Sequence, residues 1–207
     1  MNATFRLDCT QGLLFDANGR RFDPQQRVWI DGHTPVCGEA VDSIAAVAWL
    51  QQHVPVRVPV GVIGPREAPD AQLLAAEQVG CGLAKMGLVA ICGGRQGVME
   101  AVCRGAAQAG GLSIGLLPDA DPSFANPHVG VVIATGIGEA RNALIARASL
   151  CLVVIGDSYG TLSEVALGRQ FGKKVIGLEG AAKVDGVIYV DCVDQALAEV
   201  ARAVLGN

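Results

Sequence analysis

From residue 58 onward the chain repeats one pattern of apolar and polar positions. A short, wholly apolar run is followed by a turn rich in glycine and then by a longer segment with apolar residues at helical spacing. The predicted strands cover 58–63, 88–92, 112–117, 129–134, 150–155, 175–178 and 187–190. The predicted helices cover 70–86, 96–109, 139–148, 161–171 and 194–205. Uninterrupted apolar strands are typical of parallel sheets buried on both faces. The alternation therefore predicts an α/β fold, a Rossmann-like doubly wound, mostly parallel sheet with helices on both faces.

Residues 1–57 show a different pattern. Short runs at 4–7, 12–15 and 27–30 alternate apolar and polar side chains, and the sequences at 16–19 and 31–32 are typical of turns. They predict a small antiparallel sheet or a pair of hairpins. Asp42 can then cap a short helix that runs to Gln52. A segment of this size cannot build its own core, so we expect an N-terminal β-rich appendage, 1–57, packed on a main domain, 58–207.

Composition and charge exclude several classes of protein. The chain is 51% hydrophobic and only 17% charged, which excludes a disordered protein. Its net charge is −4 and no basic run occurs, so we expect no nucleic acid as the main ligand. No apolar stretch reaches the roughly 20 residues of a membrane span, and Asp8 and Thr10 interrupt any signal peptide. We therefore expect a cytoplasmic protein that does not contact membranes.

The cysteine and histidine patterns argue against a metal centre. The seven cysteines form no Cys-x-x-Cys pair, and the three histidines are dispersed. Most of the cysteines lie in apolar runs, so we expect them to be small buried hydrophobes in a reducing compartment. The sequence thus predicts neither a metal ion nor a required cofactor.

Glycine is the unusual residue. There are 27 glycines, and those after residue 58 gather where predicted strands end. The carboxyl ends of parallel strands share one rim, where helix N-termini offer unpaired N–H groups to a phosphate. That these glycines only end strands and begin turns stays the alternative reading. No P-loop motif occurs, nor a Gly-x-Gly-x-x-Gly after the first strand of the main domain, which excludes a P-loop ATPase and leaves ordinary NAD binding unsupported. The candidate loops contain Gly64, then Gly93, Gly94 and Gly97, then Gly136 and Gly138, and finally Gly156 and Gly160.

Two charged residues stand out. Arg141 shares a side of its predicted helix with Ile145 and Ala148, and an arginine bordering an apolar face needs a carboxylate or phosphate partner. A structural ion pair or a snorkelling stem is the alternative. Glu164 follows Thr161 at the spacing of a capping box, which by itself would explain both residues. Because Glu164 also lies one turn into a helix that faces the proposed ligand, a binding role stays open.

Three motifs together resemble the SLOG superfamily over about residues 58–205. The motifs are Gly93-Gly94-x-x-Gly97-Val98-Met99-Glu100-Ala101, Arg141-Asn142 and Tyr159-Gly160-Thr161-x-x-Glu164. The superfamily includes the "lonely guy" cytokinin-activating phosphoribohydrolases, often mislabelled lysine decarboxylases, and the molybdenum cofactor carrier proteins. The resemblance leaves residues 1–57 unexplained.

The resemblance implies two functions of different classes. In the carrier proteins a similar rim holds a phosphate-bearing pterin cofactor without converting it, and Arg141-Asn142, where the hydrolases usually have Arg-Lys, favours this branch. We therefore expect first a carrier or sensor that binds a nucleotide or a molybdenum cofactor. In the hydrolases the matching Arg141 and Glu164 would be catalytic and release a free base from a nucleoside 5′-monophosphate. A relative of the DNA-handling DprA type is the third reading, based on Gly64-Pro65-Arg66 and opposed by the acidic charge balance.

Taken together, the rim and the motifs predict a set of ligand contacts. These are Gly64, Gly93, Gly94, Gly97, Val98, Met99, Arg141, Asn142, Ser158, Gly160, Thr161 and Glu164. The family habit and the apolar helix residues Val165, Ala166, Leu167 and Phe171 predict a homodimer or homotetramer.

One loop departs from the family pattern. The family usually has Pro-Gly-Gly-x-Gly-Thr or Gly-Gly-Gly-x-Gly-Thr, whereas this chain has Gly156-Asp157-Ser158-Tyr159-Gly160-Thr161. Ser158 can still donate a hydrogen bond, but Asp157 would repel a nearby phosphate unless its side chain turns away. Tyr159 could stack on a base or pack at the sheet edge.

Overall fold

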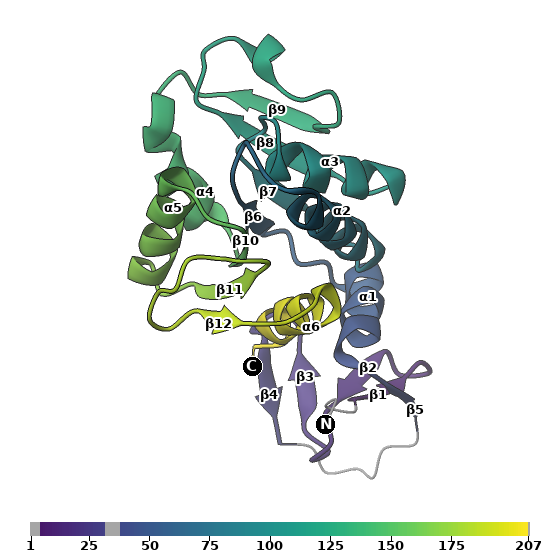
Figure 1. Cartoon of the computed structure of the whole chain (residues 1–207). Helices are drawn as coiled ribbons and strands as arrows, with labels where there is room; N and C mark the ends of the chain where they lie inside the picture. Colours follow the sequence, from purple (N-terminus) through teal and green to yellow (C-terminus); the bar gives the residue numbers. More distant parts are fainter. Residues whose placement is uncertain (1–4, 32–37, 207) are drawn as a thin grey trace.

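The main part of the protein is built on a seven-stranded parallel sheet (Figure 1). The computed structural model describes residues 5–31 and 38–206. The sheet order is β12-β11-β10-β6-β7-β8-β9, so the chain winds outward from β6 in one direction and from β10 in the other. The strands are β6 (Val60–Ile63), β7 (Ala90–Cys92), β8 (Ser113–Leu117), β9 (Val131–Ala134), β10 (Cys151–Ile155), β11 (Lys174–Leu178) and β12 (Ile188–Tyr189). The predicted doubly wound fold is confirmed.

Helices cover both faces of this sheet, as predicted. One face carries α2 (Asp70–Lys85), α3 (Val98–Gln108) and α6 (Val193–Val204), with α1 (Ser43–His53) beside α6. The other carries α4 (Asn142–Ala148) and α5 (Tyr159–Gln170). Side chains of β6 and β10 alternate between the two cores: Val62 and Val153 face the first, Ile63 and Val154 the second. Burial on both faces explains why these strands are apolar throughout.

Strand β9 is an exception to the expected burial. Val131, Val132 and Ile133 are 41%, 38% and 45% exposed, although their sequence is as apolar as that of the central strands. The expectation of a strand buried on both faces was wrong here because β9 is the edge of the sheet and pairs only with β8. Hydropathy alone does not distinguish an edge from a centre.

The segment predicted as one helix over 139–148 is two elements. A 3₁₀ turn, η2 (Gly138–Arg141), comes first, and α4 follows from Asn142. Arg141 thus lies at a junction, where its side chain is buried rather than aligned along a helix face. A second 3₁₀ turn, η1 (Pro122–Phe124), lies between β8 and β9.

Helix α5 begins two residues earlier than predicted. The Ser158 hydroxyl accepts the Thr161 N–H at 3.1 Å, so Ser158 is the N-cap and the predicted capping box at Thr161 was wrong. Glu164 therefore lies in the second turn, where its carboxyl group is directed at Arg141. On the same helix Val165 is buried in the core, which removes it from the apolar surface expected for an oligomer contact.

The N-terminal part forms a separate antiparallel sheet in the order β4-β3-β2-β1-β5. Its strands are β1 (Phe5–Asp8), β2 (Leu13–Phe15), β3 (Arg21–Asp23), β4 (Val28–Ile30) and β5 (Glu39–Val41). Strands β3 and β5 were not predicted, although they are no shorter than the predicted strands β2 and β4. The Asp42 side chain caps α1 by accepting the Ala45 N–H, as predicted. Thr4, Gly32 of the predicted 31–32 turn and Cys37 lie outside the described residues.

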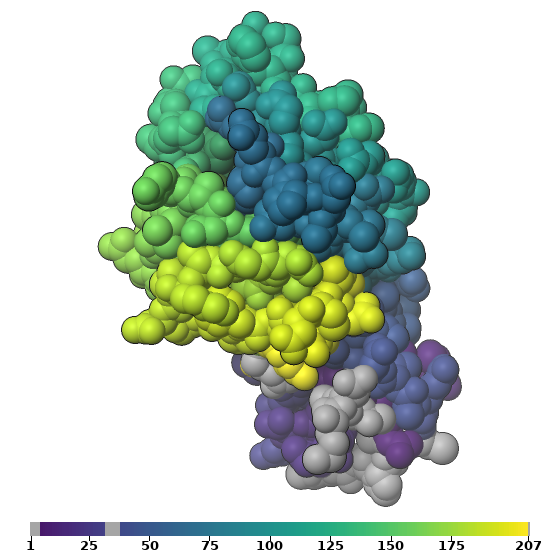
Figure 2. Space-filling view, in the orientation of Figure 1, coloured from purple at the N-terminus to yellow at the C-terminus, as the bar shows by residue number. Residues whose placement is uncertain are grey.

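The N-terminal sheet contacts α1 and the C-terminal end of α6, and its purple atoms lie below the yellow atoms of the C-terminal segment in Figure 2. The Arg27 guanidinium donates to the Ala203 and Val204 carbonyls, and the Trp29 indole N–H donates to the Leu205 carbonyl at 3.0 Å. These carbonyls lie at the C-terminal end of α6, where a helix supplies few donors of its own, and the Ala203 carbonyl also accepts the Gly206 N–H. The appendage is thus held by a helix end, and the division at residue 57 stays a prediction.

The cysteines only partly follow the expectation. Cys92, Cys103 and Cys151 are buried as expected, but Cys9 and Cys192 are exposed because both lie in connecting segments at the surface. Across residues 5–31 and 38–206, no cluster of three or more His, Cys, Asp or Glu side chains could hold a metal ion. No helix in the same ranges is long and apolar enough to cross a membrane.

Candidate functional site

A crevice of about 660 Å³ opens at the carboxyl ends of β6 and β10. These neighbouring strands are where the winding of the sheet changes direction, the usual ligand position in open α/β sheets. The walls come from the segment 63–67 after β6, from Met99 on α3, from the η2–α4 junction and from the segment 157–164 at the start of α5. The topology therefore brings four segments, far apart in sequence, to one site.

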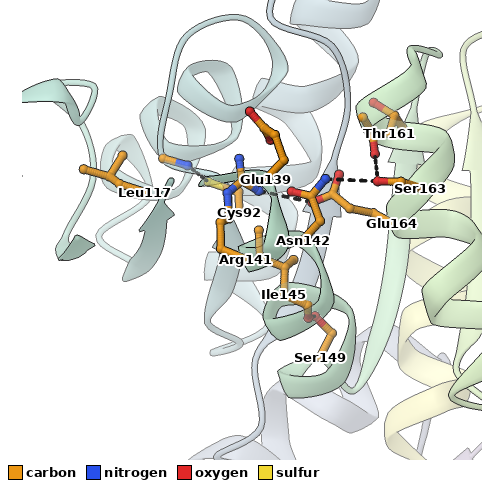
Figure 3. A network of polar contacts seen from close by, with 12 residues as sticks. Cys92, Leu117, Glu139, Arg141, Asn142, Ile145, Ser149, Thr161, Ser163 and Glu164 are labelled. Carbon is orange, nitrogen blue, oxygen red and sulfur yellow. Dashed lines mark hydrogen bonds and ion pairs between the residues drawn. The ribbon is translucent and has the colours of Figure 1, made fainter. Parts of the chain in front are cut away.

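Arg141 and Glu164 form the back of this crevice (Figure 3). Arg141 Nη1 lies 3.3 Å from Glu164 Oε1, and the two side chains are only 5% and 8% exposed. The Arg141 Nε has no hydrogen-bond partner among the described residues. A buried guanidinium with an unused donor retains capacity for a further acceptor.

Burial controls the charge of this pair. It raises the pKa of Glu164 to about 8, even though Arg141 acts to lower it, and Glu139 raises it further. Near neutral pH the Glu164 carboxyl is therefore mostly protonated. Arg141 then keeps its positive charge without a full counter-charge at the back of the crevice, and an anion bound there would supply the missing charge.

A second group of polar contacts joins α4 to the first turn of α5. The Asn142 side-chain amide donates to Ser163 Oγ at 3.0 Å, and the Ser163 hydroxyl donates to the Gly160 carbonyl. Asn142 Oδ1 is buried and has no partner among the described residues. These contacts fix the α5 N-terminus, whose first N–H groups are free of intrahelical bonds, at the crevice wall.

Charged and aromatic side chains surround the mouth. Arg66 Nη2 lies 3.6 Å from Glu139 Oε1, an exposed ion pair between two walls. The Asp157 carboxylate has no hydrogen-bond or ion-pair partner within the described residues, and it is exposed. Tyr159 is 95% exposed, so the alternative that it packs at the sheet edge was wrong. The rim therefore carries mixed charge and a free aromatic ring.

The structure brings together eight of the twelve predicted contact residues. The crevice is lined by Gly64, Met99, Arg141, Asn142, Ser158, Gly160, Thr161 and Glu164. Sequence reasoning did not select Glu67, Glu139 or Ser163. The only signal available was that each lies within a few residues of a strand end or of a selected residue.

Four predicted contacts lie behind the wall rather than on it: Gly93, Gly94, Gly97 and Val98. A Cβ on Gly93 would lie 2.5 Å from Arg141 Nη2, and one on Gly64 would lie 2.6 Å from Val98 Cγ1. Gly97, with a φ of +70°, packs against the backbone of Pro65 and Arg66. In this structure these glycines make room for Arg141 and for neighbouring backbone, a packing role that was not predicted from the sequence.

Comparison with known proteins extends this description. The model of the SLOG cluster4 family matches residues 57–205. An uncharacterised protein of Archaeoglobus fulgidus is 36% identical over 138 residues, which cover 67% of this chain and 91% of that protein.

Two solved structures are similar at 33% identity and a TM-score of 0.66. One is the molybdenum cofactor binding protein of Rippkaea orientalis, and the similar region covers 70% of this chain and 96% of that protein. The other is the molybdenum cofactor carrier protein of Chlamydomonas reinhardtii, and the similar region covers 73% of this chain and 100% of that protein. The family match spans the sheet and every wall of the crevice, and it excludes the N-terminal sheet. This chain belongs to the SLOG cluster4 family.

Proposed function

We propose that this protein binds a phosphate-bearing small molecule, a nucleotide or a molybdopterin-type cofactor, in the crevice between β6 and β10, as a carrier or sensor. The observation that carries the proposal is Arg141, a buried cation with an unused Nε beside a carboxyl group that burial keeps protonated. Charged donors of this kind make strong hydrogen bonds to phosphate oxygens.

The residues of the crevice fit such a ligand. A phosphate would be held by Arg141, by the Ser158 hydroxyl and by the Tyr159 and Gly160 N–H groups, which precede the capped Thr161 N–H at the start of α5. The volume of about 660 Å³ is in the range of small-molecule sites. Tyr159 offers an exposed ring on which a planar heterocycle could stack. The two similar structures of cofactor-binding proteins support the same class of ligand.

The test begins with the ligand itself. We expect native mass spectrometry of the purified protein to detect a phosphate-bearing small molecule that is absent after denaturation and refolding. Binding of AMP, GMP and inorganic phosphate is then measured by calorimetry, and Arg141→Ala should weaken binding by about 10- to 150-fold, the loss of one charged hydrogen bond. Arg147→Ala is the matched control, because Arg147 is an exposed arginine of α4 outside the crevice. Equal affinity in the two variants would contradict the proposal.

Glu164 favours a second candidate function, the hydrolysis of nucleoside 5′-monophosphates. A buried carboxyl group with a pKa raised to about 8 can donate a proton to a departing base while water adds to the ribose carbon. Arg141 would hold the phosphate in place. Incubation with AMP and related ribotides, followed by chromatography, tests this: free base that disappears in Glu164→Gln supports hydrolysis. No release, together with binding that depends on Arg141, leaves the carrier function alone.

We also propose that the protein is cytoplasmic and assembles as a homodimer or homotetramer. The six cysteines within the described residues are all unpaired, as in a reducing compartment. Edge strand β9 exposes three β-branched apolar side chains, and such an edge is a template for pairing with another chain.

A further inference from the structure

Cys92 and Cys103 are in contact directly behind the crevice. Cys92 is the last residue of β7, and Cys103 lies on α3. Their sulfur atoms are 3.6 Å apart, and both side chains are fully buried. A disulfide bond requires about 2.05 Å between sulfurs, so the two atoms must approach each other by roughly a further 1.5 Å.

Cys92 also holds the loop that supports Arg141. Its sulfur accepts the Gly94 N–H at 3.4 Å and lies 3.7 Å from the Met99 carbonyl oxygen. Gly93, in the same loop, packs against the Arg141 guanidinium and the Met99 sulfur. Figure 3 shows Cys92 beside Arg141, on the side opposite Glu164. The thiol pair is therefore connected to the ligand site through Gly94 and Gly93, and from Gly93 to the Arg141 side chain.

The two thiols differ in acidity. The hydrogen bond with Cys92 lowers the pKa of Cys103 to about 7, helped by Ser113 and Asn126 and opposed by burial. The same contact, with burial, raises the pKa of Cys92 well above its ordinary value. Near neutral pH the pair therefore contains a nucleophilic thiolate beside a thiol, the combination from which disulfides form.

We propose that Cys92 and Cys103 are a redox-modification site, at which a peroxide forms a reversible disulfide that weakens ligand binding in the crevice. The Cys103 sulfur attacks hydrogen peroxide, breaks the O–O bond and becomes a sulfenic acid with release of water. The Cys92 sulfur then attacks the sulfenic sulfur, the S–S bond forms, and a second water leaves. In total, two thiols lose two electrons and two protons, and one peroxide becomes two waters.

The disulfide would act on the site through the Gly93–Gly94 loop. A sulfur bonded to Cys103 is drawn toward α3, away from the Gly94 N–H and the Met99 carbonyl. Because a core this closely packed transmits small shifts, Gly93 and Met99 then press on Arg141. We expect the oxidised protein to bind its ligand between about 5- and 150-fold more weakly, the usual range of coupling between two sites. Only this last step rests on the proposed function.

Peptide mapping tests the bond itself. Trypsin cleaves after Lys85, Arg95 and Arg104, so Cys92 and Cys103 fall in separate peptides, 86–95 and 96–104. After treatment with hydrogen peroxide and blocking of free thiols, we expect these two peptides to be joined and to separate with dithiothreitol. Joining should be slower than oxidation of the exposed Cys9 and Cys192, because the buried pair reacts only on local opening. Oxidation of Cys9 and Cys192 with no joined peptide would overturn the proposal.

Hydrogen exchange tests the connection to the site without a ligand. The protein with the Cys92–Cys103 disulfide should show changed amide exchange at residues 93–99 and 138–142, and reduction should reverse the change. Cys103→Ser and Cys103→Ala should abolish both the joining and the change, whereas Cys151→Ser, at another buried thiol, should abolish neither. Joining with unchanged exchange at 138–142 would overturn the link to Arg141. If the reduced protein binds neither AMP, GMP nor phosphate, the proposed function fails while the disulfide is still judged by the peptide map.

Discussion

Arg141 Nη1 and Glu164 Oε1 lie 3.3 Å apart, and both side chains are buried. The two residues are 23 positions apart in sequence, and the 3₁₀ turn before α4 and the second turn of α5 bring them together. Because burial acts more strongly on Glu164 than Arg141 does, the pair is better described as a cation beside a neutral acid than as an ion pair.

The first prediction concerns the pH dependence of stability. The pKa of Glu164 is about 8 in the folded protein and about 4.3 when unfolded, so the folded state binds the extra proton between these values. The contribution of Glu164 to the free energy of unfolding is fully present below about pH 4.3. It is lost as the pH rises to about 8, by at most about 1.4 kcal/mol per pH unit. Glu164→Gln, which cannot ionise, should therefore lose less stability than the wild type over this range. Urea unfolding at several pH values measures the free energy of unfolding of both proteins. If the wild type instead lost less stability than Glu164→Gln as the pH rises, Glu164 would be ionised in the folded protein.

The second prediction concerns Asp157. Its unpaired carboxylate lies at the crevice wall beside the start of α5 and repels a phosphate. Asp157→Asn should raise the affinity for inorganic phosphate severalfold in about 20 mM salt, and the gain should shrink in about 500 mM salt as screening increases. Asp185→Asn removes an equal charge from an exposed residue outside the crevice and should leave the affinity unchanged. A gain of the same size in both variants would point to net charge instead of position.

The third prediction concerns the cap of α5. Since Ser158 Oγ accepts the Thr161 N–H, Ser158→Ala should lower the free energy of unfolding by about 1 kcal/mol, and Ser158→Gly by only a few tenths. Thermal or urea unfolding distinguishes the two. If Ser158→Ala has no effect, the helix begins elsewhere.

The fourth prediction concerns the attachment of the N-terminal sheet. Arg27→Ala removes the charged donors that bind the last carbonyls of α6 and should cost about 2 kcal/mol. Limited proteolysis should then cut within 1–57 faster than in the wild type, while the 58–207 fragment persists. Arg21→Ala is the control, because Arg21 is an exposed arginine of the same sheet. Equal cleavage rates in both variants would contradict the attachment.

The fifth prediction concerns β9. Ile133→Lys places a charge on the exposed apolar edge and should shift the protein to a smaller species in light-scattering measurements of mass. The monomer should keep its fold, since Ile133 is already largely exposed. A wild-type protein that is monomeric at all concentrations would contradict the oligomer.

The structure brings eight of the twelve candidate residues to one crevice, but their local positions differ from those that the sequence predicted. The structure places the candidates Arg141 and Glu164 in the crevice, but their predicted helix positions were wrong by a 3₁₀ turn and by two residues of α5. The local pattern left the start of α5 ambiguous, because both Ser158 and Thr161 are residues that cap helices. Gly93 and Gly97 were expected at the ligand, whereas the structure packs them against Arg141 and against backbone.

The sequence by itself determined the strand–helix alternation, and with it the parallel sheet and the rim where a ligand site can form. It could do so because periodicity and glycine placement are local properties of the chain. Only the tertiary structure decided that β9 is an edge, that Ser158 caps α5, and that Arg141 and Glu164 share one buried place. Burial, pairing and pKa depend on segments distant in sequence, and their positions are set when the sheet and its helices pack together.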